Sequence, residues 1–214
     1  PSLFSFCTFE HSLKSCSGVS LDAQIKLIVN NKTYVEMGTI LITHRGFSGP
    51  AVLRLSAFSA RDLYVNKYIG KLRVNWLCMT ENEVRSKINL FKLENGKKFL
   101  LKNKPFNHLP KRLWESLLLN VNIDSQLKWS DLSKSQKEAL VKCLTMSIYS
   151  IKSRGPFGEE FVTAGGVALK EIDFKTMESK ICKGLFFAGE VLDIDGVTGG
   201  FNFQHCWTSG WVAG

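Results

Sequence analysis

The sequence predicts an α/β fold, in which a β-rich segment and a helical segment interrupt a layered domain of strands and helices. Apolar and polar residues alternate within residues 20–42, and three amphipathic helical patterns lie within 64–148. After about residue 148, short apolar strands are expected between Gly-rich turns, at residues 146–151, 160–162, 167–169 and 185–187. This last pattern is typical of the C-terminal half of a doubly wound or three-layer nucleotide-binding domain, where the chain re-enters the domain after the insertions. We therefore expect three parts: residues 1–63, 64–148 and 149–214.

The first part is predicted to contain a β-hairpin followed by a helix. Residues 24–29 alternate, Asn30-Asn31-Lys32 supplies a polar turn, and residues 33–42 are rich in β-branched and aromatic types. Ser48 resembles a helix N-cap with Pro50 in the first turn, which predicts a helix to about Leu63.

A serine nucleophile is not expected in this part. The string Gly46-Phe-Ser-Gly-Pro50 differs from the G-x-S-x-G nucleophile elbow, and a serine before Gly-Pro is better explained as a helix cap. Thr43-His44 lies just before it but completes no recognised catalytic motif.

The middle part is predicted to be mostly helical. A strand is expected over residues 71–79, and the capping-box pattern Thr80-Glu-Asn-Glu83 then starts a helix. Pro110 opens a second helix and Ser133-x-x-Gln136 caps a third. We see no metal-binding or cofactor-binding motif here, and expect the apolar stripes to form core. The predicted inward residues are Val84, Ile88, Phe91, Leu113, Trp114, Leu117, Leu118, Val121, Leu140, Val141, Leu144 and Ile148.

The last thirty-one residues carry the clearest functional pattern. The apolar run 185–187 predicts a buried strand that delivers Glu190 at its carboxyl end, and a Gly-rich loop then opens a helix at about residue 201. Apolar positions at Phe203, Cys206, Trp207 and Trp211 fall on one helix face. Such a helix start presents unpaired N–H groups, and the carboxylate accepts hydrogen bonds from sugar hydroxyls. We interpret this segment as a binding site for the flavin end of FAD.

Three stretches in order resemble one known family, the FAD-dependent flavoproteins of the BaiN/YhiN type. They are residues 38–53, residues 162–167 with Lys170-Glu171 and 176–179, and residues 184–214. The resemblance covers most of the chain and is loosest between residues 58 and 150. It implies flavin-dependent redox chemistry with noncovalent FAD and NAD(P)H as electron donor. It names neither the substrate nor a catalytic residue.

The resemblance also implies roles for individual residues. Glu190 would bind the ribityl chain of FAD, and the amides that open the last helix would face the pyrimidine edge of the flavin. The turn at 163–167 would lie near the flavin. Each role has a structural alternative. Glu190 could be an exposed carboxylate, the last helix could begin with glycines needed only for their backbone conformation, and residues 163–167 could be a plain tight turn. The predicted cofactor-binding residues are Gly165, Gly166, Gly189, Glu190, Thr198, Gly199, Gly200, Phe201 and Asn202.

His205 departs from the family pattern, which usually carries an aromatic residue at this helix position. One hypothesis is that His205 reaches the edge of the flavin and modulates protonation near neutral pH. The alternative is a half-buried packing histidine, which we favour.

The sequence contains no GxGxxG, the motif that holds the FAD pyrophosphate in this family. Gly165-Gly166 and Gly199-Gly200 lack its third glycine. We therefore expect a fragment that is inactive alone. A non-catalytic remnant or binding module is the alternative to an enzyme.

The charge is uneven. Residues 61–155 hold 19 Lys+Arg and 8 Asp+Glu, or +11, and the others hold 9 and 11, or −2, which gives the net +9. A basic nucleic-acid-associated protein is one interpretation, but the lysines are scattered and no nucleic-acid motif is present, so we expect a solvated helical surface. No stretch is apolar for the ~18 residues of a membrane span. A cytoplasmic protein is expected, or an organellar one if a targeting segment precedes this chain.

Overall fold

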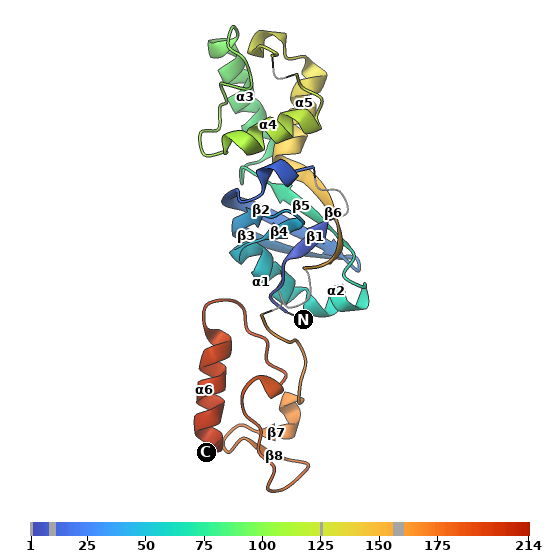
Figure 1. Ribbon diagram of the computed structural model, residues 1–214, viewed down its shortest axis with the longest axis vertical. Helices are drawn as coiled ribbons and strands as arrows, with labels where there is room; N and C mark the ends of the chain where they lie inside the picture. The colour runs from blue at the N-terminus through green and yellow to red at the C-terminus, as the bar shows by residue number, and fades with distance from the viewer. Residues whose placement is uncertain (1, 9–11, 125, 156–160) are drawn as a thin grey trace.

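The structure is a computed structural model that describes residues 2–8, 12–124, 126–155 and 161–214. It has three parts arranged along one long axis (Figure 1). A β-barrel lies in the middle, a helical unit lies at one end, and the C-terminal unit lies at the other.

The barrel is closed by six antiparallel strands in the order β1-β4-β3-β2-β5-β6. The predicted hairpin is confirmed, because its two strands pair from Ser20↔Leu41 to Val29↔Lys32. The strands are β1 (Phe6–Thr8), β2 (Ser20–Val29), β3 (Lys32–Ile42), β4 (Gly46–Ser48), β5 (Gly70–Asn75) and β6 (Ser147–Arg154).

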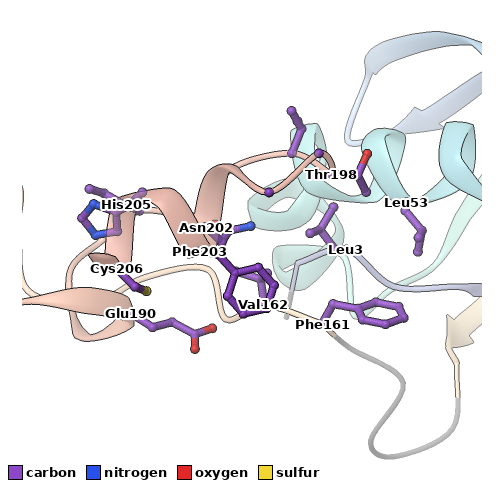
Figure 2. A pocket seen from close by; sticks show the side chains of 14 residues that line it. Leu3, Leu53, Phe161, Val162, Glu190, Thr198, Asn202, Phe203, His205 and Cys206 are labelled. Carbon is purple, nitrogen blue, oxygen red and sulfur yellow. The ribbon is translucent and has the colours of Figure 1, made fainter. Parts of the chain in front are cut away.

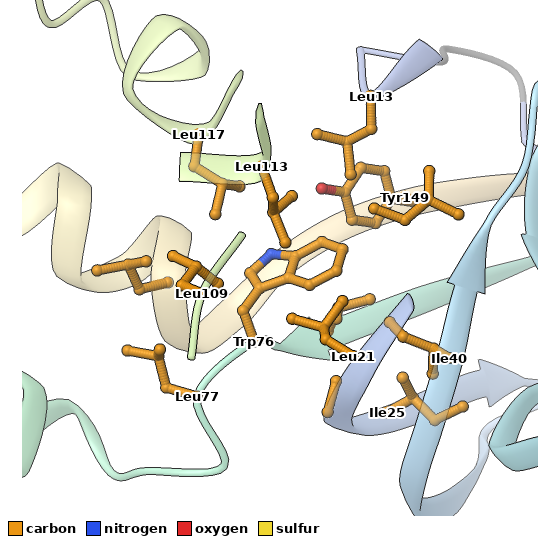
Figure 3. Packing of buried hydrophobic residues seen from close by; sticks show 14 of the residues in the cluster. Leu13, Leu21, Ile25, Ile40, Trp76, Leu77, Leu109, Leu113, Leu117 and Tyr149 are labelled. Carbon is orange, nitrogen blue, oxygen red and sulfur yellow. The ribbon is translucent and has the colours of Figure 1, made fainter. Parts of the chain in front are cut away.

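One continuous core joins the barrel to the helical unit, and Trp76 lies at the junction (Figure 3). Its ring is fully buried among leucines and isoleucines of both parts, and its Nε1 donates to the Ser147 hydroxyl at 3.0 Å. A large apolar ring with a satisfied N–H is a favourable way to join two layers, because it buries much area without leaving a polar group unpaired.

The helix after the barrel strand β4 differs from the prediction. Ser48 is the last residue of β4 and hydrogen-bonds Ser5, so Gly49 takes the N-cap position of α1 (Pro50–Phe58). A Cβ on Gly49 would meet the backbone nitrogen of Leu41 at 2.8 Å, and its φ is +98°, so this position requires glycine. The expected single helix is also interrupted at residue 59, after which α2 (Ala60–Val65) begins.

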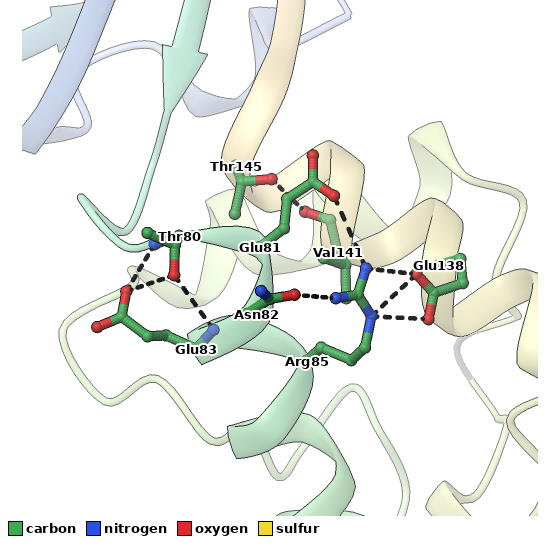
Figure 4. A network of polar contacts seen from close by, with 8 residues as sticks. All are labelled: Thr80, Glu81, Asn82, Glu83, Arg85, Glu138, Val141 and Thr145. Atoms are coloured by element: carbon green, nitrogen blue, oxygen red, sulfur yellow. Dashed lines mark hydrogen bonds and ion pairs between the residues drawn. The ribbon is translucent and has the colours of Figure 1, made fainter.

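The helical unit is inserted between β5 and β6 and contains α3 (Glu81–Asn95), α4 (Lys111–Asn120) and α5 (Lys134–Met146). Both predicted capping boxes are confirmed: Thr80 and Ser133 each exchange hydrogen bonds with the third helical residue (Figure 4, first box). Nine of the predicted inward residues are buried, while Phe91 and Val121 are half-buried.

An ion pair joins α3 to α5 beside the first of these caps. Arg85 Nη2 lies 2.8 Å from Glu138 Oε2, and Arg85 Nε lies 3.1 Å from both carboxylate oxygens (Figure 4). These hydrogen bonds lower the pKa of the Glu138 carboxyl from its ordinary value.

The inward helical position predicted for Ile148 is wrong, whereas the strand predicted over residues 146–151 is confirmed as β6. The helix α5 ends at Met146, and Ile148 lies in β6 with 57% of its surface exposed. Because β6 pairs with β5 on one side and β1 on the other, it is a barrel strand. The expected boundary between residues 148 and 149 therefore falls inside this strand.

The C-terminal unit has little regular structure apart from its final helix. Its elements are β7 (Ile172–Asp173), β8 (Glu178–Ser179) and α6 (Phe201–Ala213), with short 3-10 turns at Leu169–Glu171 and Gly189–Val191. Ile172, Met177 and Leu192 form its small buried core. Two further short 3-10 turns, Lys14–Cys16 and Trp129–Asp131, lie outside this unit.

The predicted buried strand at 185–187 is wrong. Leu185 and Phe186 are 43% and 49% exposed, and the pairing of this run in the described residues is one isolated bridge, Glu178↔Phe186. On one edge the run is bonded to the β8 segment, by Ser179 N to Leu185 O at 2.8 Å and Phe187 N to Met177 O at 3.0 Å, and it has no strand partner among the described residues on the other. The strands expected near Val162 and Val167 are likewise single bridges, and Glu160 lies outside the described residues.

No helix in the part of the chain that the structure describes is long and apolar enough to cross a membrane.

Candidate functional site

A cavity of about 370 Å³ lies between the barrel and the start of α6 (Figure 2). We call it the α6 cavity. Leu3 and Leu53 line it from the barrel side, and Phe161 and Val162 come from the segment that enters the C-terminal unit. Five of the predicted cofactor-binding residues line it: Glu190, Thr198, Gly199, Gly200 and Asn202. Gly165, Gly166, Gly189 and Phe201 do not line it.

The N-terminus of α6 presents unpaired amides beside this cavity. Gly200 is the N-cap, with φ +86°, and its carbonyl accepts the first helical hydrogen bond from Gln204 N at 2.9 Å. The amides of Phe201, Asn202 and Phe203 have no hydrogen-bond acceptor among the described residues. Unpaired N–H groups at a helix start carry partial positive charge and attract anions or electron-rich atoms.

The side chain of Asn202 fixes the loop that leads into α6. Its Oδ1 accepts from Gly196 N at 2.8 Å, and its Nδ2 donates to Gly196 O at 2.9 Å. The carboxamide is thus paired within the loop, so the backbone amide of Asn202, rather than its side chain, is the group that remains for a ligand.

Glu190 reaches the α6 cavity from a turn, not from a strand end as predicted. It lies in the 3-10 turn Gly189–Val191 and is exposed (Figure 2). Its Oε1 accepts from Thr163 N at 3.4 Å. The carboxylate therefore keeps acceptor sites for a hydroxylated ligand.

Gly166 packs against the segment directly after Glu190 rather than lining the cavity, whereas a Cβ on Gly165 would meet no atom within 4 Å. A Cβ on Gly166 would lie 2.4 Å from the carbonyl oxygen of Val191, so the two backbones approach as closely as only glycine permits. Val167 N donates to Val191 O at 2.8 Å beside this contact, and Val167 forms a parallel bridge with Leu192.

Sequence reasoning missed Ser209, which ties α6 to the turn carrying Glu190. Its buried hydroxyl accepts from Gly189 N at 2.9 Å and donates to the carbonyl of His205 at 2.7 Å. The available signal is a serine among apolar residues of a predicted helix, because such a hydroxyl commonly bonds the carbonyl four residues earlier. The barrel-side residues Leu3 and Leu53 were also missed, and no local pattern marks them.

His205 lines the α6 cavity and is half-buried. Its Nε2 lies 3.2 Å from the carbonyl oxygen of Gly189, and because a carbonyl only accepts, Nε2 carries the hydrogen. On the same helix, Phe203 and Trp207 stack with ring centroids 6.1 Å apart, and both are 68% exposed. The predicted apolar face of α6 is thus exposed in this structure.

Comparison with known proteins decides the family. Residues 15–214 match the family described as "HI0933-like protein Rossmann domain". The chain belongs to this family. The predicted α/β class and the resemblance to BaiN/YhiN-type FAD-dependent oxidoreductases are thereby confirmed.

Three curated relatives of this HI0933-like chain are informative. It is 31% identical to a 3-dehydro-bile acid delta(4,6)-reductase of Clostridium scindens over 100% of this chain and 52% of the relative. It is 33% identical to a ribosomal RNA dihydrouridine synthase of Haemophilus influenzae, over 98% of this chain and 49% of the relative. A ribosomal RNA dihydrouridine synthase of Escherichia coli is 36% identical over 83% of this chain and 43% of the relative. The chain thus spans about half the length of the curated relatives it matches.

Proposed function

We propose that the protein is a flavin-dependent reductase that binds FAD noncovalently at the α6 cavity. The observation that carries the proposal is the juxtaposition of unpaired amides at Phe201–Phe203 with an apolar cavity and the exposed Glu190 carboxylate. The volume of about 370 Å³ is near the lower end of small-molecule pockets, which suits one end of a dinucleotide.

Each element of the site has a role in this proposal. The α6 amides would face the pyrimidine edge of the flavin, where negative charge collects on reduction, so they would favour the reduced form and raise its potential. Glu190 would accept hydrogen bonds from the hydroxyls of the ribityl chain. The barrel-side wall, formed by Leu3 and Leu53, would exclude water from the flavin face.

The names of the relatives suggest the reaction class. Both kinds of name describe adding hydrogen to an unsaturated substrate. FAD held by the α6 amides and Glu190 would supply the hydride-transfer chemistry between NAD(P)H and the substrate. The balanced reaction is a carbon–carbon double bond plus NAD(P)H and a proton, giving the saturated bond and NAD(P)⁺.

The test is reconstitution of the full-length protein with FAD. We expect retained flavin absorbance after gel filtration, bleaching by NAD(P)H, and weaker FAD binding in Glu190→Gln. Glu94→Gln is the matched control, because Glu94 is exposed on α3 and forms no ion pair in the described part of the chain. A full-length protein that never takes up FAD would contradict the proposal and favour the binding-module alternative.

A further inference from the structure

A second cavity, of about 730 Å³, adjoins the α6 cavity at the rim of the barrel. We call it the barrel-rim cavity. Leu53 of α1 and Phe161 line both cavities, so they form a shared wall. A molecule in the barrel-rim cavity would therefore lie directly beside one bound in the α6 cavity.

The polar side of the barrel-rim cavity is the turn between β3 and β4, residues 43–45. Thr43 builds this turn, because its Oγ1 accepts from Gly46 N at 3.1 Å and its N donates to Gly46 O at 2.9 Å. The turn is also fixed to β1, since Thr8 N donates to the carbonyl of Arg45 at 3.0 Å. Its backbone is thus held in place from two directions.

The side chains of His44 and Arg45 are not needed for that construction. Both are exposed, and in the described residues neither side chain forms a hydrogen bond, ion pair or ring contact. Among the other arginines, Arg54, Arg61 and Arg85 each pair with a carboxylate. Arg45 thus projects its guanidinium from a turn that is held in place, and no carboxylate among the described residues pairs with it.

The charge of the barrel-rim cavity suits an anion. The described residues that line it include His44 and Arg45 but no Asp or Glu, and the hydroxyls of Ser5 and Ser48, 2.7 Å apart, add polar groups. A guanidinium binds carboxylate or phosphate oxygens through two parallel hydrogen bonds.

We propose that the His44–Arg45 turn binds an anionic group of the substrate, a phosphodiester or a carboxylate, while the ring to be reduced lies across Leu53 beside the flavin. This rests on the proposed function for the position of the flavin. It assigns these two side chains to substrate recognition, separately from the FAD-binding residues.

The experiment uses full-length protein and two probes, a uridine-containing RNA oligonucleotide and a steroid with a carboxylate side chain. Equilibrium binding of each is measured without turnover, for wild type and for Arg45→Gln and Arg45→Lys. We expect the dissociation constant of the preferred probe to rise about tenfold in Arg45→Gln, with partial recovery in Arg45→Lys. For RNA, the slope of log K against log salt should also fall by about one.

Arg112→Gln is the control, because Arg112 is exposed on α4 and has no ion pair among the described residues. FAD content should be unchanged in all variants, which separates this proposal from the flavin site. Where a probe is turned over, KM should rise in Arg45→Gln while kcat changes less than about twofold. The proposal is overturned if neither probe binds wild type, if Arg45→Gln leaves binding unchanged, or if Arg112→Gln weakens binding equally.

Discussion

His205 and Gly189 are joined by a hydrogen bond of 3.2 Å from the imidazole Nε2 to the carbonyl oxygen. The same glycine donates its N–H to the hydroxyl of Ser209. The N–H and the C=O of Gly189 are therefore both held by α6, through two side chains that lie one helical turn apart. Because Glu190 is the next residue, these two bonds set its position relative to the amides that open α6.

Removing the Ser209 hydroxyl should loosen this attachment. Ser209→Ala leaves the N–H of Gly189 without its partner, at a cost of about 1 kcal/mol. We expect faster amide hydrogen exchange in residues 185–192, measured by mass spectrometry. Thr208→Ala is the control, because Thr208 is exposed and its hydroxyl bonds Gln204 alone among the described residues. Equal exchange in the two variants would mean that the Ser209 bond does not hold the turn.

The two interpretations of His205 predict different pH behaviour. If His205 is a packing residue, His205→Phe should leave the pH dependence of the full-length enzyme unchanged but weaken FAD binding. His205→Gln, which restores a donor for Gly189 O, should recover part of that binding. A shift of the pH–rate profile in His205→Phe, with FAD binding intact, would instead support the protonation hypothesis.

A methyl group at Gly166 should separate two backbone segments. The added Cβ would lie 2.4 Å from Val191 O and 2.6 Å from the carbonyl carbon of Leu192, and neither is a flexible side-chain atom. We expect Gly166→Ala to destabilise the protein by roughly 1–3 kcal/mol in urea unfolding. Gly210→Ala in α6 meets no atom within 4 Å and should stabilise the helix by up to about 1 kcal/mol. Equal stability of both variants would argue against the close approach.

The Arg85–Glu138 pair should make stability pH-dependent at acid pH. The pKa of Glu138 is lower in the folded state, so the pair stabilises the protein above the unfolded pKa of about 4.3. That contribution is lost as pH falls through the lower folded pKa. The stability difference between wild type and Glu138→Gln should thus be constant near neutral pH and shrink below about pH 4.

Urea unfolding midpoints at several pH values measure this difference. Glu94→Gln is the control, because this exposed carboxylate of α3 forms no ion pair in the described residues. A Glu138→Gln difference that stays constant from neutral pH down to the acid limit of folding would contradict the prediction.

The sequence predicts those elements whose interacting residues are neighbours along the chain. The caps at Thr80 and Ser133 depend on groups one helical turn away, so four residues suffice to predict them. The β2–β3 hairpin was predicted because its strands and turn are contiguous. Ile148 fits both the apolar stripe of α5 and the predicted strand 146–151, and the pairing of β6 with the distant strands β5 and β1 decides for the strand.

The residues of the α6 cavity likewise divide into those that a local sequence pattern predicts and those that only the fold brings together. The carboxylate and the glycines before α6 were identified from a pattern within thirty-one residues, whereas Leu3 and Leu53 lie more than 130 residues away from them and carry no distinguishing motif. Ser48 is not the predicted cap, because its hydroxyl pairs with Ser5, which precedes β1 and lies 43 residues away along the chain.

By itself, the sequence determined the family resemblance and the final helix with its glycine lead-in, because each depends on residue types at short, fixed spacing. Only the tertiary structure decided that the barrel supplies one wall of the α6 cavity and that Glu190 lies in a turn. It also decided that His44 and Arg45 line the adjoining barrel-rim cavity. Cavities form where segments distant along the chain come together, and the free energy that brings them together is that of the whole packed core.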